Sequence, residues 1–501
     1  MRILFAASEV APLAKTGGLA DVAGALPRAL ARLGEEVRVV MPAYRVAMDP
    51  RHHLRDAGLA LSVPIGGRSE TAAVLEGRLG AGPGGDSGGE AGGVPVFLIR
   101  ADRYYDRDGL YGVAGQDYQD NAERFAFFSR AVVELARQGP FKPDLFHLHD
   151  WQTGLVAAYL KHLYAGDPAL GQPASVFTIH NLGYQGLFWH YDMHLTGLGW
   201  ELFTPEGLEF WGKLSYLKAG LVFADMLTTV SPTYAREIQT PELGHGMDGV
   251  LRARADRLVG ILNGIDTEEW NPATDRYIAR RYNARTLAGK GVCKADLQRT
   301  FGLPVEPKTP LLGVVTRLAE QKGVDLLDAV LPALVERGVQ FVLLGSGDPA
   351  YEARFRASAA RWPRQVGVRI AYDNVLAHKI EAGADMFLMP SRYEPCGLNQ
   401  MMSLRYGTVP IVRATGGLAD TVMEASPEAG GNGFVFVEYD PAAFLAAIDR
   451  ALAAYRKPRT WRALMRRGMA GDYSWDAAAR RYLEVYRQAR RLAAGREAVE
   501  V

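Results

Sequence analysis

The feature that most constrains the fold is an alternation, repeated twice along the 501-residue chain, of short apolar runs with amphipathic stretches. In the first half, runs rich in β-branched residues predict strands at 2–7, 37–41, 94–99, 144–149, 175–180, 226–230 and 258–262. After a less regular stretch around 264–308, further strands are predicted at 311–316, 340–344, 368–371, 386–389 and 409–412. Strands that alternate with helices indicate βαβ units. The sequence therefore predicts an α/β protein with mostly parallel sheets, built as two halves of similar size.

Several helices are placed by the residues that bend or end them. The first is expected to run to about Leu33, where Gly34 can end it. Pro27 lies inside this stretch and should kink the helix or mark a restart, because proline lacks the N–H that a helix interior needs. Another helix is predicted at 324–337. The last helix, at about 475–494, is rich in Arg and Ala and can pack on either half.

The composition excludes several classes of protein. Hydrophobic residues make up 48% of the chain, and 57 Lys and Arg residues balance 56 Asp and Glu residues to give a net charge of +1. Such a chain is not disordered, and its neutrality argues against a nucleic-acid or membrane-surface partner. No apolar run is long enough to span a bilayer, and the N-terminus resembles a buried strand more than a signal peptide. The two cysteines, Cys293 and Cys396, cannot form a disulfide framework, so a cytoplasmic location is expected.

Glycine is unusually frequent, at 55 residues, and part of the excess is concentrated in the segment GAGPGGDSGGEAGG at 80–93. A segment of this composition cannot bury a core, so we expect a flexible surface loop between two strands. The alternative, a loop that cradles a phosphate, is disfavoured because no helix follows at the right offset.

One hexapeptide, TGGLAD, occurs twice, at 16–21 and at 415–420. Each copy follows a predicted strand and leads toward a helical stretch. The two copies are either two similar strand–turn–helix junctions or two glycine turns, one in each half, that meet a ligand between the halves. An anion would suit the first copy, because Gly17 and Gly18 precede a helix and Lys15 adds a positive charge. The GxGxxG pattern of nicotinamide-binding proteins is missing after the first strand, and the diphosphate of a nucleotide sugar fits as well as any anion.

Polar residues end two further strands of the first half. His147 and His149 lie on one face of a strand, so they are possible metal ligands, but no Cys/His/Asp cluster elsewhere completes a site and a structural role is favoured. Asp150 follows them, and His180 with Asn181 ends the next strand. Because open α/β sheets bind ligands at the carboxyl ends of their strands, Asp150 and His180 are candidates for hydrogen bonds to a hydroxylated ligand.

The second half carries charged residues at equivalent places. Arg317 and Lys322 flank a loop that opens a helix, where they could neutralise a pyrophosphate; the alternative is a pair of solvated surface charges. The segment 345–348, GSGD, would let the backbone approach a ligand closely. Glu394 lies in the loop after a strand and could bind sugar hydroxyls or stabilise an oxocarbenium-like transition state. Cys396 lacks the surroundings of a catalytic cysteine and is expected to be a buried packing residue.

Taken together, these segments resemble the bacterial glycogen synthase and plant starch synthase family, in order and over nearly the whole chain. The motifs are KTGGLADV from Lys15, HLHDWQTGL from His147, FTIHNLGYQG from Phe177, VSPTYAREI from Val230, ILNGID from Ile261, TRLAEQKG from Thr316, LGSGDP from Leu344, SRYEPCGL from Ser391 and TGGLADTV from Thr415. Each motif alone is weakly specific, whereas the ordered set is highly specific.

This resemblance implies a GT-B glycosyltransferase: two Rossmann-like domains that face each other across a deep cleft. The N-terminal domain, on the acceptor side, would span 1–262, and the chain from about 477 to 501 would cross back onto it. The C-terminal domain, on the donor side, would span 263–476. The implied reaction transfers glucose from ADP-glucose to the non-reducing 4-hydroxyl of an α-1,4-glucan such as glycogen, with retention of the anomeric configuration and without a metal or another cofactor.

The resemblance also implies roles for single residues. Arg317 and Lys322 would neutralise the departing diphosphate, a group whose negative charge grows in the transition state. Asp150, His180 and Asn263 would hold the glucosyl unit, and Glu394 would contact its hydroxyls. The remaining substrate contacts are implied for Lys15, Gly18, Asp21, Tyr111, Gly347, Tyr372, Thr415, Gly416 and Gly417, with Tyr111 on the sugar and Tyr372 stacked on the adenine.

Three other functions are alternatives to this glucosyl transfer. A related GT-B transferase would use UDP-glucose or a sugar-phosphate acceptor, and donor competition distinguishes it. A nucleotide-dependent oxidoreductase is disfavoured by the missing GxGxxG pattern. A glucan-binding protein without catalysis would leave Lys15, Arg317 and Lys322 unexplained.

Overall fold

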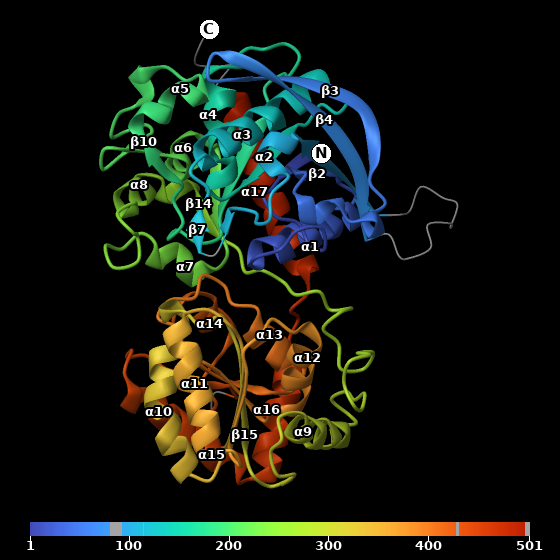
Figure 1. Cartoon of the computed structure of the whole chain (residues 1–501), viewed down its shortest axis with the longest axis vertical. Helices are drawn as coiled ribbons and strands as arrows, with labels where there is room; N and C mark the ends of the chain where they lie inside the picture. Colours follow the sequence, from blue (N-terminus) through green and yellow to red (C-terminus); the bar gives the residue numbers. More distant parts are fainter. Residues whose placement is uncertain (81–92, 114, 427–429, 496–501) are drawn as a thin grey trace. The chain divides into compact units, whose positions relative to one another are not determined.

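The structure, a computed structural model, describes residues 1–80, 93–113, 115–426 and 430–495. The chain forms two compact units (Figure 1). The N-terminal unit comprises Met1–Val230, Ala235–Ile261 and the chain from Trp475 onward. The C-terminal unit comprises Ser231–Tyr234 and Leu262–Ser474. Each unit is an α/β structure around its own sheet, which confirms the predicted fold class.

Among the described residues, the sheet of the N-terminal unit has nine strands. The first seven strands in sheet order run parallel to one another. The central strand, β1 (Arg2–Ala6), is buried along four of its five residues, as expected for an apolar run covered by helices on both faces. In sheet order the strands are β14 (Leu258–Gly260), β13 (Met226–Thr229), β9 (Ala174–Ile179), β8 (Leu145–His149), β1 (Arg2–Ala6), β2 (Glu36–Pro42), β5 (Val94–Arg100), β4 (Arg68–Leu79) and β3 (Arg55–Ile65).

The last two strands of this sheet, β3 and β4, are not among those predicted. They form an antiparallel hairpin whose two-residue turn, Gly66-Gly67, has φ values of 54° and 77°. A turn of that kind needs positive φ at both positions, which glycine adopts without strain. Buried and exposed residues alternate in the second half of β3, whereas β4, which lies between β3 and β5, mixes buried and partly buried residues.

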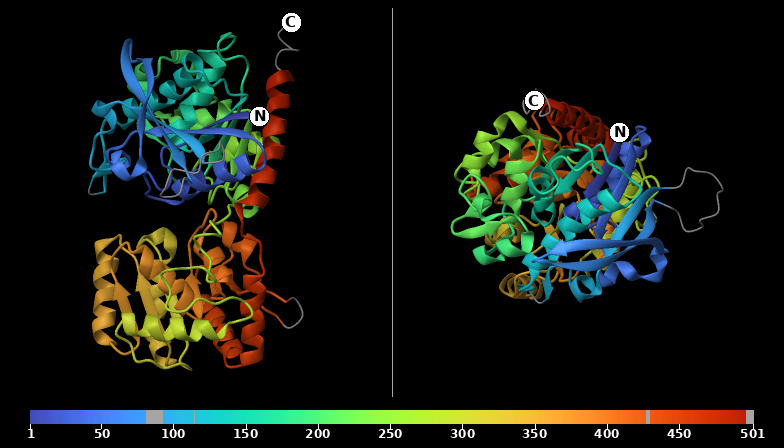
Figure 2. Two further views of the ribbon diagram at one scale, coloured as in Figure 1. Left: turned by 90° about the vertical axis from the view of Figure 1, so that its right-hand side faces the viewer. Right: turned by 90° about the horizontal axis from the view of Figure 1, so that it is seen from above.

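The helix α1 (Gly18–Arg32) runs through Pro27 as one continuous element, so no restart occurs there. Pro27 is buried together with the apolar residues beside it, and this packing offsets the hydrogen bond that the proline cannot make. The helix ends at Arg32 with Leu33 as its C-cap, within one residue of the predicted end, and Gly34 follows with φ of 90°. The C-terminal helix α17 (Trp475–Gly495) packs against α1 and β9, and Asp476 pairs with Arg32 at 2.7 Å; Figure 2 shows it along the side of the N-terminal unit.

The remaining elements of the N-terminal part complete the layers around its sheet. A small antiparallel sheet has the order β10 (Leu187–Trp189), β12 (Lys213–Ser215), β11 (Glu209–Phe210). The other elements are α2 (Asp102–Tyr105), β6 (Gly112–Val113), β7 (Gln116–Asp117), α3 (Asn121–Gln138), α4 (Trp151–His162), α5 (Met193–Thr196), α6 (Tyr216–Phe223), α8 (Asp248–Ala253) and α7 (Pro232–Glu237), whose first residues belong to the C-terminal unit.

The sheet of the C-terminal unit has six parallel strands, and both of its faces are buried. Alternate residues of its second strand enter two separate apolar clusters: Phe341 and Leu343 pack in one, Val342 and Leu344 in the other. In sheet order the strands are β17 (Val366–Arg369), β16 (Gln340–Leu344), β15 (Leu311–Val315), β18 (Met386–Met389), β19 (Val409–Arg413) and β20 (Phe434–Phe436). The helices are α9 (Ala288–Thr300), α10 (Val324–Glu336), α11 (Pro349–Arg361), α12 (Asn374–Gly383), α13 (Asn399–Arg405), α14 (Gly416–Thr421), α15 (Pro441–Tyr455) and α16 (Pro458–Met469).

One predicted strand of this unit is displaced. The strand expected at 368–371 is β17, which begins two residues earlier at Val366 and pairs there with Phe341. Asp373 caps α12 by accepting a hydrogen bond from the Leu376 N–H, so the residues after Arg369 are needed for the connection.

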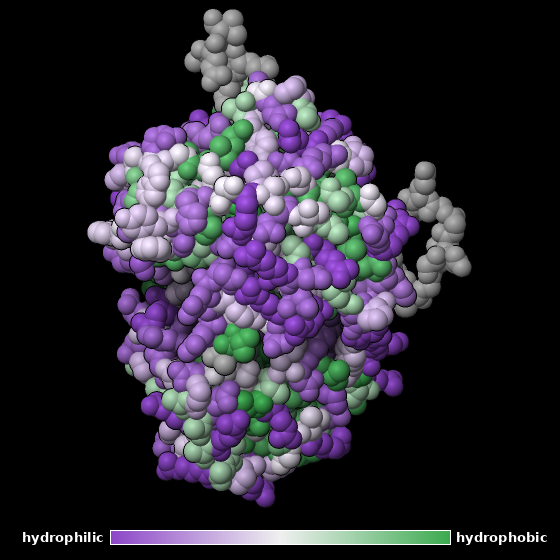
Figure 3. Space-filling model, turned by 45° about the horizontal axis from the view of Figure 1, so that its top comes forward, coloured by the Kyte–Doolittle hydropathy of each residue, from purple (hydrophilic) through white to green (hydrophobic). Residues whose placement is uncertain are grey.

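The Gly-rich segment predicted as a surface loop at 80–93 lies, for residues 81–92, outside the described residues. The flanking strands β4 and β5 end at Leu79 and begin at Val94. Within the described ranges, no helix combines the length and the apolar character that crossing a bilayer requires. On the face seen in Figure 3, hydrophilic side chains predominate and hydrophobic ones form small, separate patches.

The irregular segment after residue 263 is attached to its own unit by a buried histidine. His378 of α12 stacks on Trp270, with 3.9 Å between ring centroids, and its Nδ1 lies 2.8 Å from a carboxylate oxygen of Asp275. The Tyr406 hydroxyl donates to the same oxygen at 2.6 Å. Burial alone would lower the pKa of His378, but the contacts with Asp275 and Glu269 outweigh it and raise the pKa to about 9. The imidazolium is therefore the favoured form at neutral pH.

This histidine should make the stability of the C-terminal unit depend on pH. Because its folded pKa lies above the ordinary 6.5, its contribution is fully present below pH 6.5 and is lost as the pH rises through about 9. We expect the free energy of unfolding to fall by an amount on the order of 3 kcal/mol over this range. Urea unfolding of the wild type and of His378→Asn at pH 6.5 and 9.5 checks this; parallel changes in both proteins would contradict it.

Candidate functional site

In the N-terminal unit, the loop between β1 and α1 is organised by a buried carboxylate, Glu9, which is 4% exposed. One Glu9 oxygen accepts hydrogen bonds from the backbone N–H groups of Thr16 and Gly17. The other accepts from the Thr16 hydroxyl at 2.6 Å and from the Tyr111 hydroxyl at 2.7 Å. Glu9 thus fixes the predicted anion-binding loop and Tyr111 relative to each other. The sequence analysis did not identify Glu9, because its neighbours in the sequence carry no motif signal.

The two glycines at the start of α1 have open space around them. A Cβ added to Gly17 or Gly18 would meet no atom within 4 Å, and neither residue has a positive φ. Neither backbone conformation nor packing requires glycine here, and the free space suits the close approach of a ligand to the start of the helix, where the Gly17 N–H already donates to Glu9. Lys15 and Asp21 lie at the same helix start and form an ion pair of 2.5 Å. The structure therefore brings Lys15, Gly18 and Asp21 together.

Replacing Glu9 with glutamine should weaken this arrangement. The new amide group would place an N–H₂ against donors that now bond to a carboxylate, and hydrogen bonds to a charged group contribute more than neutral ones. For the transfer reaction that the sequence resemblance implies, we expect kcat/KM to fall by about tenfold to a hundredfold. Steady-state kinetics of Glu9→Gln test this, with Glu36→Gln as a control, since Glu36 has a side chain that is 56% exposed. Equal kinetics for the two variants would refute the role of Glu9.

Asp150 follows β8 in a backbone conformation that only glycine adopts easily, with φ of 54° and ψ of −176°. Its carboxylate accepts hydrogen bonds from the backbone N–H groups of His180, at 2.7 Å, and Asn181. Burial raises the pKa of Asp150 to about 7, although both hydrogen bonds oppose the change. Strain of this kind, held in place by surrounding contacts, is concentrated at functional sites. The predicted pair of Asp150 and His180 is thus brought together at the carboxyl ends of β8 and β9.

The histidines of β8 and β9 are used by the chain itself. His147 contacts the Thr178 hydroxyl at 2.7 Å and the Tyr486 hydroxyl of α17 at 2.8 Å. His149 lies with its Nδ1 2.9 Å from the Nε2 of His180. Burial lowers the pKa of all three histidines, that of His180 to about 3, so they are neutral. A neutral His180 is suited to hydrogen bonding with a sugar hydroxyl, and His147 has the structural role expected for it.

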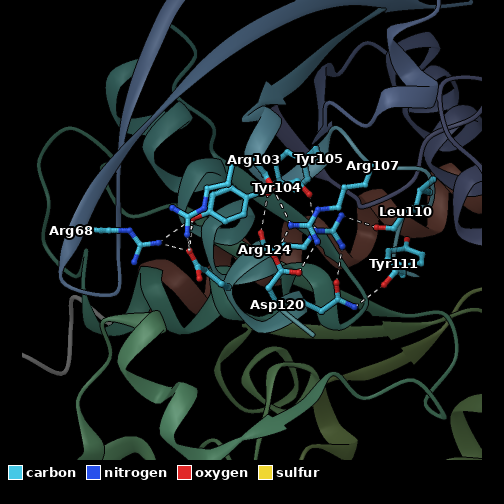
Figure 4. Close-up of polar contacts among 11 residues, drawn as sticks. Arg68, Arg103, Tyr104, Tyr105, Arg107, Leu110, Tyr111, Asp120 and Arg124 are labelled. Atoms are coloured by element: carbon cyan, nitrogen blue, oxygen red, sulfur yellow. Dashed lines mark hydrogen bonds and ion pairs between the residues drawn. The ribbon is translucent and has the colours of Figure 1, made fainter. Parts of the chain in front are cut away.

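Tyr111 is positioned by a fully buried arginine, Arg124 (Figure 4). The Arg124 guanidinium donates to the backbone carbonyl of Tyr104 at 2.8 Å, to the side-chain oxygen of Asn121 at 2.7 Å and to the backbone carbonyl of Leu110 at 2.9 Å. Asn121 in turn donates to the backbone carbonyl of Tyr111 at 2.9 Å. Nothing in the local sequence distinguishes Arg124 from the many exposed arginines, so only the structure identifies its role.

In the C-terminal unit, Lys322 and Glu394 form a closely matched ion pair. The Lys322 Nζ lies 2.9 and 2.7 Å from the two carboxylate oxygens of Glu394, and the Ser391 hydroxyl donates to one of them at 2.9 Å. The two charged side chains are 19% and 6% exposed. Lys322 reaches the pair from the loop after β15, and Glu394 from the loop after β18, its neighbour in the sheet. Two residues that lie far apart in the sequence are therefore brought together at one edge.

Arg317 lies in the same loop as Lys322 but remains exposed. Within the described ranges its side chain donates one hydrogen bond, to the side-chain oxygen of Gln321 at 3.4 Å, and no carboxylate of these ranges forms an ion pair with it. Its charge is thus available to an anionic ligand. In the protein without a ligand, Arg317 is a solvated surface charge, which was the alternative considered for both residues. Lys322 is not a solvated charge, because it is paired with Glu394.

Unlike Gly17 and Gly18, three glycines of this unit are required by close packing against neighbouring backbone. A Cβ on Gly416 would lie 1.9 Å from the Glu394 carbonyl oxygen, and one on Gly417 would lie 2.1 Å from the Cys396 carbonyl oxygen. A Cβ on Gly347 would lie 2.4 Å from the Leu318 carbonyl oxygen. These glycines let the loops that carry Glu394 and Arg317 pack backbone to backbone with their neighbours. The two TGGLAD copies therefore share a sequence but need their glycines for different reasons.

The other predicted residues of this unit differ in exposure. Tyr372 is 82% exposed, so its ring is free to stack on a planar group. Asn263 is 6% exposed, and its side-chain oxygen has no hydrogen-bond partner among the described residues. Thr415 is buried, at 2% exposed. Cys396 is buried, which raises the pKa of its thiol to about 12, and it is a packing residue as expected.

Within 1–80, 93–113, 115–426 and 430–495, no three His, Cys, Asp or Glu side chains are grouped so that they could hold a metal ion. The histidines of the HxH segment instead bond to the hydroxyl groups and the imidazole described above.

Comparison with known proteins gives consistent results. Residues 2–253 match the sequence family described as the starch synthase catalytic domain, and residues 299–466 match glycosyl transferases group 1. A glycogen synthase of Syntrophotalea carbinolica is 52% identical over 490 residues, which cover 98% of this chain and 99% of that protein. A glycogen synthase of Anaeromyxobacter dehalogenans is 54% identical over 489 residues, covering 97% and 99%.

Solved structures agree with these relatives. The catalytic domain of starch synthase IV from Arabidopsis thaliana, bound to ADP and acarbose, aligns with a TM-score of 0.89 at 36% identity and covers 98% of this chain and 99% of that one. A sucrose-phosphate synthase from Thermosynechococcus elongatus aligns with a TM-score of 0.58 at 19% identity over 97% and 98% of the two chains, a likeness of fold alone.

Proposed function

Because this chain belongs to the glycogen and starch synthase family of glycosyltransferases, we propose that it uses ADP-glucose as donor and adds glucose to the non-reducing 4-hydroxyl of an α-1,4-glucan. In this reaction the bond from the glucosyl C1 to the diphosphate breaks, a bond to the acceptor oxygen forms on the same face of the sugar, and the hydroxyl proton leaves. The ADP found with the Arabidopsis starch synthase supports an adenine nucleotide as the leaving group.

The observation that carries the proposal is the arrangement of charges in the C-terminal unit. Lys322 is held against Glu394 at 2.7 Å, and Arg317 stands in the same loop without a carboxylate partner in the described ranges. Cations fixed before the reaction stabilise a leaving group whose negative charge grows in the transition state. We assign the diphosphate to Arg317 and Lys322, and the hydroxyl groups of the transferred glucose to Glu394.

The same unit supplies the rest of the proposed donor site. The exposed ring of Tyr372 would stack on the adenine, and the unpartnered side-chain oxygen of Asn263 would accept a hydrogen bond from a sugar hydroxyl. Near the diphosphate we assign backbone contacts to Gly347, Thr415, Gly416 and Gly417.

We assign the acceptor to the N-terminal unit. Asp150 and the neutral His180, at the carboxyl ends of β8 and β9, would bond with hydroxyls of the transferred glucosyl unit, and Tyr111, whose hydroxyl donates to Glu9, would contact a sugar. The helix start with Lys15, Gly18 and Asp21 is assigned to the anionic part of the donor, because backbone N–H groups and a lysine favour negative charge. An uncharged glucan matches a chain whose overall charge is only +1.

Donor competition tests this assignment. Purified protein is incubated with glycogen and equal concentrations of ADP-glucose and UDP-glucose, and the released nucleotides are separated and quantified. We expect ADP to predominate and its release to depend on glycogen. Predominant release of UDP, or transfer to a sugar phosphate instead of glycogen, would replace the proposal by the related transferase.

A further inference from the structure

A short piece of the first half of the sequence belongs to the C-terminal unit. The chain leaves the N-terminal unit after Val230, contributes Ser231–Tyr234 to the C-terminal unit, and returns to the N-terminal unit at Ala235. We call Ser231–Tyr234 the crossover segment. It lies within the motif VSPTYAREI, and none of its residues is assigned to a substrate in the proposed function. The contacts of this segment therefore need a separate explanation.

The crossover segment is bonded to the second TGGLAD copy through Asp420. One carboxylate oxygen of Asp420 accepts a hydrogen bond from the Thr233 N–H at 2.8 Å, and the other accepts from the Thr233 hydroxyl at 2.7 Å. Thr233 is the second residue of α7, so Asp420 satisfies an N–H group at the start of that helix. The corresponding residue of the first copy, Asp21, pairs with Lys15 instead. The two aspartates of the repeated hexapeptide thus have different partners.

The crossover segment is also bonded to the loop that carries Glu394. Ser231 is fully buried, and its hydroxyl donates to the backbone carbonyl of Pro395, the residue after Glu394, at 2.7 Å. The same hydroxyl accepts a hydrogen bond from the Tyr234 N–H at 3.1 Å. Because the hydroxyl is used both as donor and as acceptor, its orientation is fixed, and the start of α7 is held against the backbone of the Glu394 loop.

Together these contacts form a closed ring of hydrogen bonds that includes the backbone of Glu394. The Gly417 N–H, three residues before Asp420 in α14, lies 3.2 Å from the carbonyl oxygens of both Glu394 and Pro395. The ring runs from this backbone through α14 to Asp420, then to the crossover segment, and returns to Pro395. A side chain at a reacting centre keeps its geometry when the residues behind it are themselves fixed by hydrogen bonds. The ring fixes the backbone from which the Glu394 carboxylate extends.

We propose that Asp420 and Ser231 are positioning residues, which hold the Glu394 loop through the crossover segment so that the Glu394 carboxylate meets the hydroxyls of the transferred glucose. The proposal rests on the proposed function in taking Glu394 as the residue that contacts this glucose. The side chains assigned to the adenine and to the charge of the diphosphate, those of Tyr372, Arg317 and Lys322, lie outside the ring. Loss of Asp420 or Ser231 should therefore slow the transfer and leave nucleotide binding intact.

The first test separates turnover from nucleotide affinity in the full chain. Asp420→Ala and Ser231→Ala should each lower kcat by about tenfold to a hundredfold, the loss that follows a small displacement of a group at the reacting centre. The dissociation constant for ADP, measured by titration calorimetry, should stay within about twofold of the wild type. Thr233→Ser keeps both donors to Asp420 and should retain most of the turnover, whereas Thr233→Val keeps only the N–H and should lose part of it.

Asp440→Ala is the matched control, because it also removes an aspartate that caps a helix of the C-terminal unit. The Asp440 carboxylate accepts from the N–H groups of Ala442 and Ala443 at the start of α15. Within the described ranges, it accepts no hydrogen bond from the crossover segment or from the Glu394 loop. The control should lower the Tm and leave kcat within about twofold of the wild type. If Asp420→Ala behaved in the same way, its role would be structural only and the proposal would be overturned.

A double-mutant cycle tests whether the positioning acts through Glu394. Glu394→Ala alone should lower kcat strongly, and Asp420→Ala added to it should cause less than about a twofold further loss, because two changes that affect the same contact are not additive. If Asp420→Ala does not fold, Thr233→Val takes its place in the cycle.

The outcomes of the cycle separate the two proposals. A double variant that shows the product of the two single losses, or a kcat of the wild type in both Asp420→Ala and Ser231→Ala, would overturn the positioning while leaving the role of Glu394 intact. A weakening of ADP binding by the same factor as kcat would also overturn it. Near-normal turnover of Glu394→Ala would instead refute the role assigned to Glu394 in the proposed function, and the positioning with it.

Discussion

Replacing Arg317 with alanine is expected to lower kcat by about 100- to 1000-fold while leaving the Tm unchanged. The loss follows from removing a fixed positive charge where the diphosphate gains negative charge. The stability should not change, because Arg317 is exposed and makes one long hydrogen bond to Gln321, of 3.4 Å. Single-turnover kinetics with ADP-glucose and calorimetric unfolding of the same preparation measure the two quantities.

Lys322 supplies the matched comparison. Lys322→Ala should lower kcat by a similar factor but also lower the Tm, because it leaves the carboxylate of Glu394, 6% exposed, without its cation. The double variant Lys322→Met/Glu394→Gln should recover much of the stability and none of the activity. Near-normal turnover of Arg317→Ala and Lys322→Ala would contradict the diphosphate assignment, and equal Tm losses in both would contradict the difference in their environments.

Replacing Arg124 with leucine is expected to have the largest effect on stability, about 3–5 kcal/mol. The guanidinium satisfies three acceptors, buried ones on Tyr104 and Asn121 and a partly buried one on Leu110, and leucine would leave them without this donor. The segment that ends at Tyr111 would lose its attachment, so activity should fall as well. Urea unfolding of the variant and the wild type gives the difference in free energy.

Arg103 is the control for Arg124, since both appear in the same network (Figure 4). Arg103 is 61% exposed and pairs with Glu70 at 2.9 Å on the surface. An exposed pair contributes at most about 1 kcal/mol, so Arg103→Leu should unfold close to the wild type. If the two variants lost the same stability, the structural role of Arg124 would be refuted.

The parallel strands were predictable because each is a short apolar run that alternates with helical stretches, and most of them are buried on both faces. Strands such as β16 and β18 have the predicted bounds. The hairpin β3–β4 was missed although Gly66-Gly67 is a strong turn signal, since its half-polar alternation differs from the continuous runs that identified the other strands. Of the kink or restart predicted at Pro27, the restart does not occur, because tertiary packing outweighed a local preference.

The residues of the candidate site that could be predicted are charged residues in loops that follow predicted strands. Lys322 and Glu394 were each identified from their loops, but their pairing depends on β15 and β18 being neighbours, which the sequence order does not show. Glu9 and Arg124 were beyond prediction, since a buried charge looks in the sequence like any surface charge. The repeated TGGLAD segment shows the converse: identical letters hide open space around Gly17 and tight backbone packing around Gly416.

The central claim is transfer of glucose from ADP-glucose to an α-1,4-glucan with retention, and one measurement tests it directly. The protein is incubated with ADP-[1-¹³C]glucose and maltoheptaose, and the product is followed by carbon NMR while ADP is quantified. The account predicts an α-1,4-linked labelled residue at the non-reducing end, with one ADP released for each glucose added. A β-linked product, free labelled glucose, or no ADP release would contradict it.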